Sequence, residues 1–217
     1  MDTYNAIMER ITANATKAKA LEEEVKAMPW SKRTDAAIAA KATEAENLKM
    51  ENRFLSDNAV IAYVAEKLPG IIEVFAKYNG KPYGEKTAAK INDEIKSRFS
   101  CSVHISRRYS WDEMFIYPLV NGYTDYRSPD INLYSGCDTR LFDGNKINIE
   151  AFKALRIYGG RTYTDDPAAA VAEVRTALAE AKKAFDEYEK ALAALNNITP
   201  YGTDHIFAAA PAWYKII

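Results

Sequence analysis

Residues 165–195 read DDPAAAVAEVRTALAEAKKAFDEYEKALAAL and carry the most regular hydrophobic repeat in the chain. Two acids and a proline open the stretch, as in the first turn of a helix, where negative charge and a fixed backbone angle are favourable. Alanine widens the apolar stripe to about three positions in seven, which favours a multi-helix bundle over a two-stranded coil. The two main rows are Val171, Leu178, Phe185 and Leu192, and Val174, Ala181, Tyr188 and Leu195.

A second seven-residue repeat lies at the N-terminus and predicts one helix that Pro29 ends. Asn14 is the only polar member of its rows, and a polar residue in such a seam penalises wrong registers. After a short turn, Thr34 is placed to cap a second helix with inward positions as far as Leu55. Short connections make helices antiparallel neighbours, so residues 1–56 are predicted to form a helical hairpin.

From Asp57 to Phe75 the chain is apolar on most helical faces, which predicts a core segment bent near Pro69-Gly70. A further helix is expected over residues 84–99, with Ile91 and Ile95 facing inward. The period then changes to two, which is typical of strands, and turn dipeptides follow at intervals. Strands are predicted over residues 101–106, 113–119 and 130–134, and a short helix over residues 149–158.

Together these patterns predict an α+β, predominantly helical protein. It would combine a long antiparallel helical hairpin or bundle, similar to a coiled coil, with a small antiparallel β-sheet in the middle. Three segments are expected: an N-terminal helical hairpin over residues 1–56, an α+β segment over residues 57–164, and residues 165–217, where the last long helix packs on the bundle and is followed by an aromatic tail.

The composition is nearly neutral, with 29 lysines and arginines against 30 aspartates and glutamates. No global field would therefore draw the whole surface to nucleic acid or to an anionic membrane, so binding of that kind requires a local patch. Two cysteines are too few for a secreted disulfide framework, and the first residues do not resemble a signal peptide. We expect a cytoplasmic protein without a membrane-spanning helix.

Cys101, His104, Cys137 and His205 are the only residues that would make a Cys2His2 zinc site. Side chains three apart on a strand point to opposite faces, so Cys101 and His104 are not expected to share a metal ion. Cys137 lies near Arg140, which can lower a thiol pKa, but no known catalytic pattern surrounds it. Phosphate-binding glycine motifs are absent. We therefore predict no metal, no cofactor and no catalytic residue.

The middle segment is rich in arginine and aromatic residues, with ten basic and seven acidic side chains between residues 96 and 163. Such a mixture suits stacking on unpaired bases, bonding to phosphate, or a protein interaction hot spot. Tyrosines that simply pack a small sheet would explain individual positions equally well. Arg107 and Arg108 fall in a predicted hairpin connection and are expected to face solvent. The predicted partner-binding residues are Arg107, Arg108, Tyr109, Trp111, Tyr123, Tyr126, Arg127, Arg140 and Arg161.

Residues 77–96, KYNGKPYGEKTAAKINDEIK, resemble a segment of uncharacterised accessory proteins from phages and prophages of Gram-positive gut bacteria. The resemblance covers about a tenth of the chain and brings no catalytic residue with it. It implies a mobile-element accessory protein in the cytoplasm of a host cell. Binding to a host complex, including inhibition of a defence complex, would be a role of such a protein.

The sequence thus predicts a non-enzymatic binding protein, monomeric or homodimeric. Its partner would be a protein or a nucleoprotein complex, and nucleic acid could be reached through the arginine- and tyrosine-rich segment. Two alternatives stay open. One is a structural or oligomerisation subunit, such as a virion or assembly component, in which the heptads pair between chains; the other is a cysteine-dependent enzyme.

Overall fold

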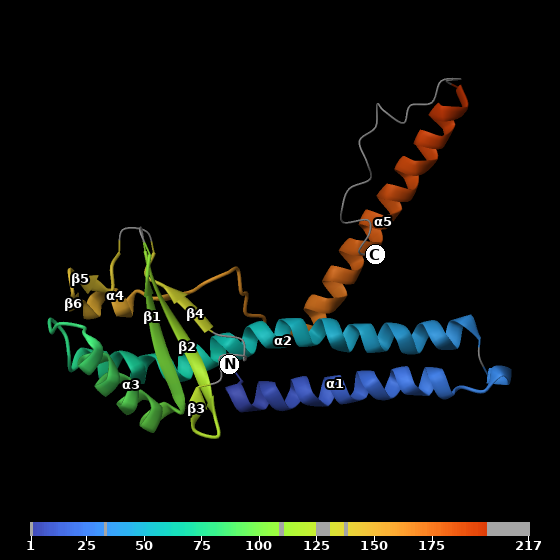
Figure 1. Ribbon diagram of the computed structural model, residues 1–217. Helices are drawn as coiled ribbons and strands as arrows, with labels where there is room; N and C mark the ends of the chain where they lie inside the picture. The colour runs from blue at the N-terminus through green and yellow to red at the C-terminus, as the bar shows by residue number, and fades with distance from the viewer. Residues whose placement is uncertain (1, 33, 109–110, 125–130, 137–138, 199–217) are drawn as a thin grey trace. The chain divides into compact units, whose positions relative to one another are not determined.

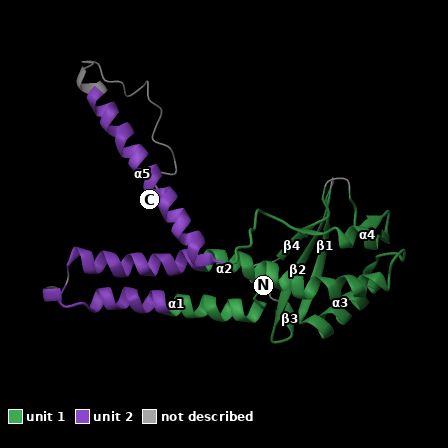
Figure 2. Ribbon diagram, turned by 180° about the vertical axis from the view of Figure 1, so that it is seen from behind, with its two compact units in different colours: residues 1–16, 52–165 green, residues 17–51, 166–217 purple. Residues whose placement is uncertain are grey.

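The structure is a computed structural model that describes residues 2–32, 34–108, 111–124, 131–136 and 139–198 (Figure 1). The chain divides into two compact units (Figure 2). One unit contains residues 1–16 and 52–165, and the other contains residues 17–51 and 166–217. The predicted fold class is confirmed, since the protein is α+β, mainly helical, with a small antiparallel sheet in the middle of the chain.

Helices α1 (Tyr4–Ala27) and α2 (Asp35–Ala76) contribute to both units, and a short 3-10 turn, η1 (Trp30–Lys32), lies between them in the chain. In the unit of residues 17–51, Ala18 and Leu21 pack against Ala45. Ion pairs join the two helices beside this seam, with Lys17 Nζ 2.8 Å from Glu44 Oε1. The predicted hairpin contacts are confirmed here.

In the other unit, the start of α1 packs against the middle of α2. Ile7 is buried together with Leu55, Ala59 and Ala62. Asn52 Nδ2 donates to the backbone oxygen of Ile11 at 3.0 Å, so a side-chain amide fixes how the two helices are aligned. The buried amide nitrogen of Asn14 has no hydrogen-bond partner among the described residues, and its role in register stays a prediction.

Helix α2 is one continuous helix of 42 residues that passes through both the expected change at residue 57 and Pro69. A proline leaves one carbonyl of the preceding turn without its amide partner, but neighbouring packing can hold the helix together. At the next position, a Cβ added to Gly70 would lie 2.4 Å from Cζ of Phe99. Glycine therefore lets the aromatic ring of the following helix approach the backbone.

Helix α3 (Glu85–Phe99) leads directly into the sheet, with Ile91 and Ile95 buried as predicted. Ser100 ends it in a left-handed conformation, with φ of 53°. The strands are β1 (Cys101–Arg107), β2 (Asp112–Val120), β3 (Tyr123–Thr124), β4 (Ile131–Tyr134) and β7 (Arg156–Ile157). The order is β1-β2-β4-β7, every pairing is antiparallel, and β3 extends the far end of β2.

The helix predicted over residues 149–158 is too long. Helix α4 covers only Ile149–Lys153, and residues 156–157 form β7 at the sheet edge. Backbone pairing of Leu133 with Ile157 and of Tyr134 with Arg156 replaces the helical hydrogen bonds. A separate hairpin precedes α4, made of β5 (Phe142–Asp143) and β6 (Lys146–Ile147).

One face of the sheet forms the hydrophobic core with α2, α3 and α4 (Figure 1). Met114, Ile116 and Leu133 of the sheet are fully buried there. Phe75 of α2 stacks on Phe152 of α4 with ring centroids 4.3 Å apart. Most of the buried apolar residues of the unit belong to this cluster, so the sheet and its covering helices share one packed core.

Helix α5 (Pro167–Ile198) begins where the acid-acid-proline pattern predicts. Asp166 Oδ1 accepts from the backbone nitrogen of Ala169 at 3.0 Å, which is an N-cap bond. Near its start Val171 is buried, and Arg175 Nη2 donates to the backbone oxygen of Thr43 at 3.4 Å. Farther along the predicted seam, Leu178 is 39 % exposed.

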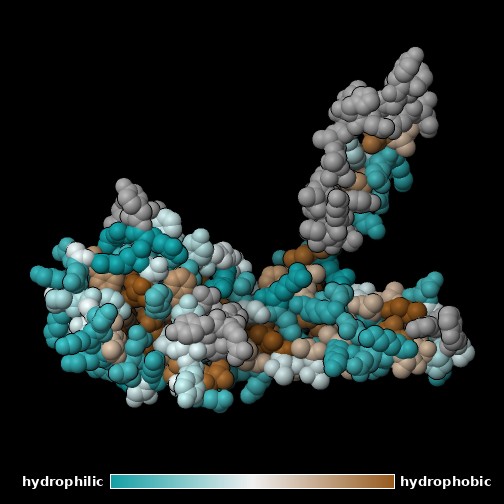
Figure 3. Space-filling view, in the orientation of Figure 1, coloured by the Kyte–Doolittle hydropathy of each residue, from teal (hydrophilic) through white to brown (hydrophobic). Residues whose placement is uncertain are grey.

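No described helix combines the length and the apolar composition needed to span a bilayer. On the surface seen in Figure 3, hydrophobic residues reach solvent in small patches between hydrophilic ones.

Candidate functional site

The beginning of β2 places two adjacent carboxylates, Asp112 and Glu113, where the sheet meets the arginine-rich segment. Consecutive strand residues point to opposite faces of the sheet, so the two carboxylates lie in different surroundings. Both are buried, with exposed fractions of 1 % and 6 %. Buried carboxylates need charged or hydrogen-bonding partners, and here arginines supply them.

Glu113 lies on the face away from the core. Arg108 Nε donates to its Oε2 at 2.9 Å, and Trp111 Nε1 donates to its Oε1 at 3.2 Å. Burial by itself would raise the pKa of Glu113, but these two hydrogen bonds and the charge of Arg108 outweigh it and hold that pKa below its ordinary value. Glu113 is therefore ionised at neutral pH and fixes two of the predicted binding residues.

Asp112 lies on the core-side face and ties the strand to the segment before β5. Its Oδ2 accepts from the backbone nitrogen of Leu141 at 2.8 Å. Arg140 Nη1 donates to the backbone oxygen of Arg108 at 2.7 Å and to Asp112 Oδ1 at 3.4 Å. Arg140 thus joins two chain segments, because its partners Asp112 and Arg108 lie 28 and 32 residues away from it in the sequence.

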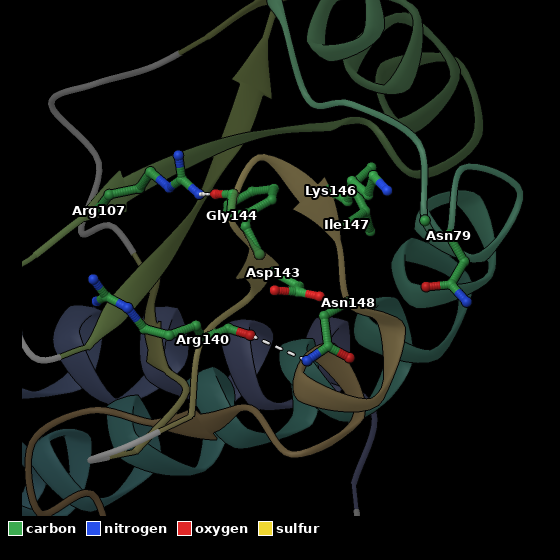
Figure 4. Close-up of a pocket in the computed structure, with 10 residues that line it drawn as sticks. Asn79, Arg107, Arg140, Asp143, Gly144, Lys146, Ile147 and Asn148 are labelled. Carbon is green, nitrogen blue, oxygen red and sulfur yellow. Dashed lines mark hydrogen bonds between the residues drawn. The ribbon is translucent and has the colours of Figure 1, made fainter.

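Arg107 at the end of β1 is held in a similar way. Its guanidinium carbon lies 4.6 Å from the ring centroid of Phe142, a cation–π contact, and its Nη2 donates to the backbone oxygen of Gly144. Figure 4 shows Arg107 directed at the turn of the β5–β6 hairpin, with Arg140 on the same side. The aromatic ring and the turn therefore hold the guanidinium in place.

These arginines border an open cavity of about 960 Å³ (Figure 4). Among the described residues that line it, Arg107, Arg140 and Lys146 are the cations and Asp143 is the one carboxylate. Its other side is formed by Asn79 and Gly80, from the turn that follows α2, and by Asn148, the N-cap residue of α4. A cavity with three cations against one anion favours an acidic ligand. We call these lining residues the cationic cavity.

The expectation that Arg107 and Arg108 face solvent is confirmed, but both arginines also have bonded partners. Both are exposed, but Arg108 is bonded to buried Glu113 and Arg107 to the β5–β6 turn. Reversing the charge of Arg108 would leave a buried carboxylate without its cation, which is destabilising. The two arginines therefore belong to a structural network as well as to the surface.

The structure does not bring all predicted binding residues together. Arg107, Arg108, Trp111 and Arg140 gather at the start of β2, whereas Tyr123 lies at the other end of that strand and is 80 % exposed. Arg161 is half-buried in the loop before α5. The predicted residues that fall outside the described part of the chain are Tyr109, Tyr126 and Arg127.

Sequence reasoning missed Lys146, Asp143 and Asn148, because the β5–β6 hairpin reaches the arginines only in three dimensions. The predicted partner-binding residues also leave out the aromatic side chains of the sheet face opposite the core, although the tyrosines of that face belong to the aromatic-rich middle segment that the sequence singled out. The aromatic members of that face are Phe115, Tyr117, Tyr134 and Tyr158, and His104 lies beside Phe115. Their alternation with core residues was the available signal.

The described residues hold no group of three or more histidine, cysteine or acidic side chains placed for a metal ion. Cys101 is fully buried and His104 is exposed, as alternation along a strand predicts. Burial raises the pKa of the Cys101 thiol to about 11, so it is not a thiolate at neutral pH. Cys137 and His205 lie outside the described residues.

Comparisons with protein-family models, with curated proteins and with solved structures find no match to this chain.

Proposed function

We propose that this protein is a non-enzymatic binding protein that holds an acidic group of a partner in the cationic cavity. The observation that carries the proposal is that Arg107, Arg140 and Lys146 line one cavity of about 960 Å³, whose described lining residues include a single carboxylate, Asp143. Guanidinium groups bond carboxylates and phosphates through paired N–H donors, and lysine adds a point charge.

The two arginines are positioned before any ligand arrives, which supports a binding role. Phe142 and Gly144 hold Arg107, and Asp112 and the backbone of Arg108 hold Arg140. Each guanidinium has five N–H donors, so donors beyond these contacts remain for a ligand. A side chain that is already fixed loses less conformational entropy on binding.

The partner we propose is a protein or nucleoprotein complex that inserts an acidic side chain or a phosphate. In the phage setting that the resemblance of residues 77–96 implies, this partner would be a host complex, including one of a defence system, and occupancy of its binding surface would inhibit it. The proposal assigns no catalytic residue.

The test is titration of the whole protein with inorganic pyrophosphate and, separately, with a glutamate-rich peptide at low salt. We expect at least one to bind, and Lys146→Glu to weaken that binding about tenfold or more, since repulsion replaces attraction in the cavity. Lys146 is exposed in a tight hairpin, so the fold should tolerate the change.

Lys86→Glu is the matched control. It makes the same charge change at an exposed site in the first turn of α3, outside the cavity, where an acid is favourable. Equal binding by both variants, or no binding of either probe at millimolar concentration, would count against the proposal.

A second function, self-association, is favoured by the surface of α5. Val174 and Leu178, adjacent on the helix surface, are 36 % and 39 % exposed although they belong to a regular heptad seam. A second copy of the same helix would present the matching apolar row.

A further inference from the structure

The sheet has a second face, turned away from the core, whose side chains form rows across the strands. His104 of β1 is paired with Phe115 of β2, and Phe115 is paired with Asn132 of β4. The backbone nitrogen of Tyr158, the residue after β7, donates to the backbone oxygen of Asn132 at 2.8 Å. This bond continues the row past β7. Paired residues in an antiparallel sheet point to the same side, so these side chains share one face.

Aromatic rings dominate this outer face, which we define by His104, Phe115, Tyr117, Tyr134 and Tyr158. Phe115 and Tyr117 are nearly parallel, with ring centroids 6.2 Å apart and an angle of 13° between planes. Tyr134 meets Tyr158 edge to face at 5.8 Å, and Tyr158 is 53 % exposed. In the described part of the chain, none of the five belongs to the hydrophobic core.

The face ends in a groove at the β1 edge, with a volume of about 330 Å³. Its sheet side includes His104, Tyr117 and Thr124, and its helix side includes Asn92 and Lys96 of α3. Ring nitrogens, hydroxyls and an amide are groups that hydrogen-bond the edge of a nucleobase.

The charges around the outer face favour an anionic ligand. Lys96 lies in the groove, and Arg156 is paired with Tyr134 at the opposite strand. The buried charge of Glu113 is matched by Arg108, which leaves Asp93 in the groove, among the described residues, as the acid beside these cations. Cations at both ends of an aromatic surface match a backbone of phosphates that crosses the strands.

We propose that the outer face binds single-stranded nucleic acid, with bases stacked on Phe115 and Tyr117 and one base in the groove beside His104. This inference rests on the proposed binding role but uses residues separate from the cationic cavity. A duplex keeps its bases inside the helix, whereas unpaired bases are free to lie flat on aromatic rings. Stacking needs only the flat surface of a base, so little sequence preference is expected.

The experiment measures fluorescence anisotropy of a labelled oligo(dT) or oligo(U), roughly 15 nucleotides long, with the whole protein, against the matched duplex. We expect the single strand to bind at least about tenfold more tightly than the duplex, and its affinity to fall as salt rises. The double variant Phe115→Val/Tyr117→Val should lose about tenfold or more in affinity, because both rings on which bases stack are removed. Valine keeps strand propensity, and thermal melting checks the fold of the variant.

Val120→Ala is the control, since Val120 is a 51 % exposed residue of the same strand that lies off the outer face. It should bind the single strand as wild type does. The inference is overturned if wild type shows no preference for the single strand, or if a folded Phe115/Tyr117 variant binds equally well. The inference would also be overturned if a protein partner required Phe115 and Tyr117 for binding and stayed bound after nuclease treatment.

Lys146→Glu separates this inference from the proposed function. If it weakens pyrophosphate or peptide binding but leaves oligonucleotide binding within about threefold, the two sites are distinct, as the inference requires. If oligonucleotide binding follows Lys146 and ignores Phe115 and Tyr117, the cavity alone holds the phosphates and the stacking surface is refuted.

Discussion

Glu113 is the residue that links the chemistry of the candidate site to the stability of the sheet. Its carboxylate is buried on the outer face, yet it is held by Arg108 and Trp111, both of which we predicted to bind a partner. A side chain that binds a buried charge cannot be changed without an effect on folding. Weaker partner binding by an Arg108 variant would therefore not show whether a contact or the folded structure had been lost.

Glu113→Gln should show this coupling through pH. The folded-state pKa of Glu113 lies below its ordinary value of 4.5, so its ionised form adds stability that is fully present above about pH 4.5 and is lost as pH falls through the lower, folded value. We expect the variant to unfold more easily at pH 7, by about 1–2 kcal/mol in urea titrations, and the difference to shrink in acid.

Glu150→Gln serves as the comparison for that measurement. Glu150 is 73 % exposed and pairs with Lys153 on the surface of α4, where an ion pair contributes less than about 1 kcal/mol. A Glu113 variant whose stability tracks wild type at every pH would show that the buried carboxylate is not coupled to Arg108 as the geometry indicates.

At the scale of elements, the contact between α2 and α3 depends on a residue without a side chain. A Cβ at Gly70 would meet the ring of Phe99 at 2.4 Å. Gly70→Val should force that ring out of its place and lower the free energy of unfolding by about 1–3 kcal/mol. Thermal or chemical unfolding measures the loss.

Ala65→Val is the control on the same helix, because Ala65 is exposed and valine there changes helix propensity by no more than about 0.7 kcal/mol. If Gly70→Val is as stable as this control, Phe99 has room to move and the close approach of α3 to α2 does not stabilise the unit.

The strands show that a sequence pattern can locate an element without predicting every strand that pairs with it. The period of two located β1, β2 and β4, and it separates core residues such as Met114 from outer residues such as Phe115. It did not indicate that residues 156–157 would leave the helical pattern, because that strand exists only through pairing with β4.

At the scale of the whole molecule, the exposed apolar seam of α5 leads to a prediction about the oligomeric state in solution. If the seam pairs between copies, light scattering of the wild-type protein will give more than the 24.3 kDa of one chain. Leu178→Glu should then return the mass to that of one chain, because a charge in an apolar seam is unfavourable.

Lys183→Glu changes charge on the same helix outside the two heptad rows and should leave the mass unchanged. A wild-type protein of 24.3 kDa at all concentrations would exclude self-association through this helix.

The sequence by itself determined the fold class, the positions of the long helices, three of the strands, and which residues alternate into the core. These features follow from local periodicity and caps, such as the acids before Pro167 and the inward pair Ile91 and Ile95. Only the tertiary structure decided that α2 continues past residue 57, that Arg108 binds Glu113, and that Lys146 and Arg107 line one cavity. Such contacts join segments that are distant in sequence or depend on which neighbour buries a charge, and no local pattern specifies either.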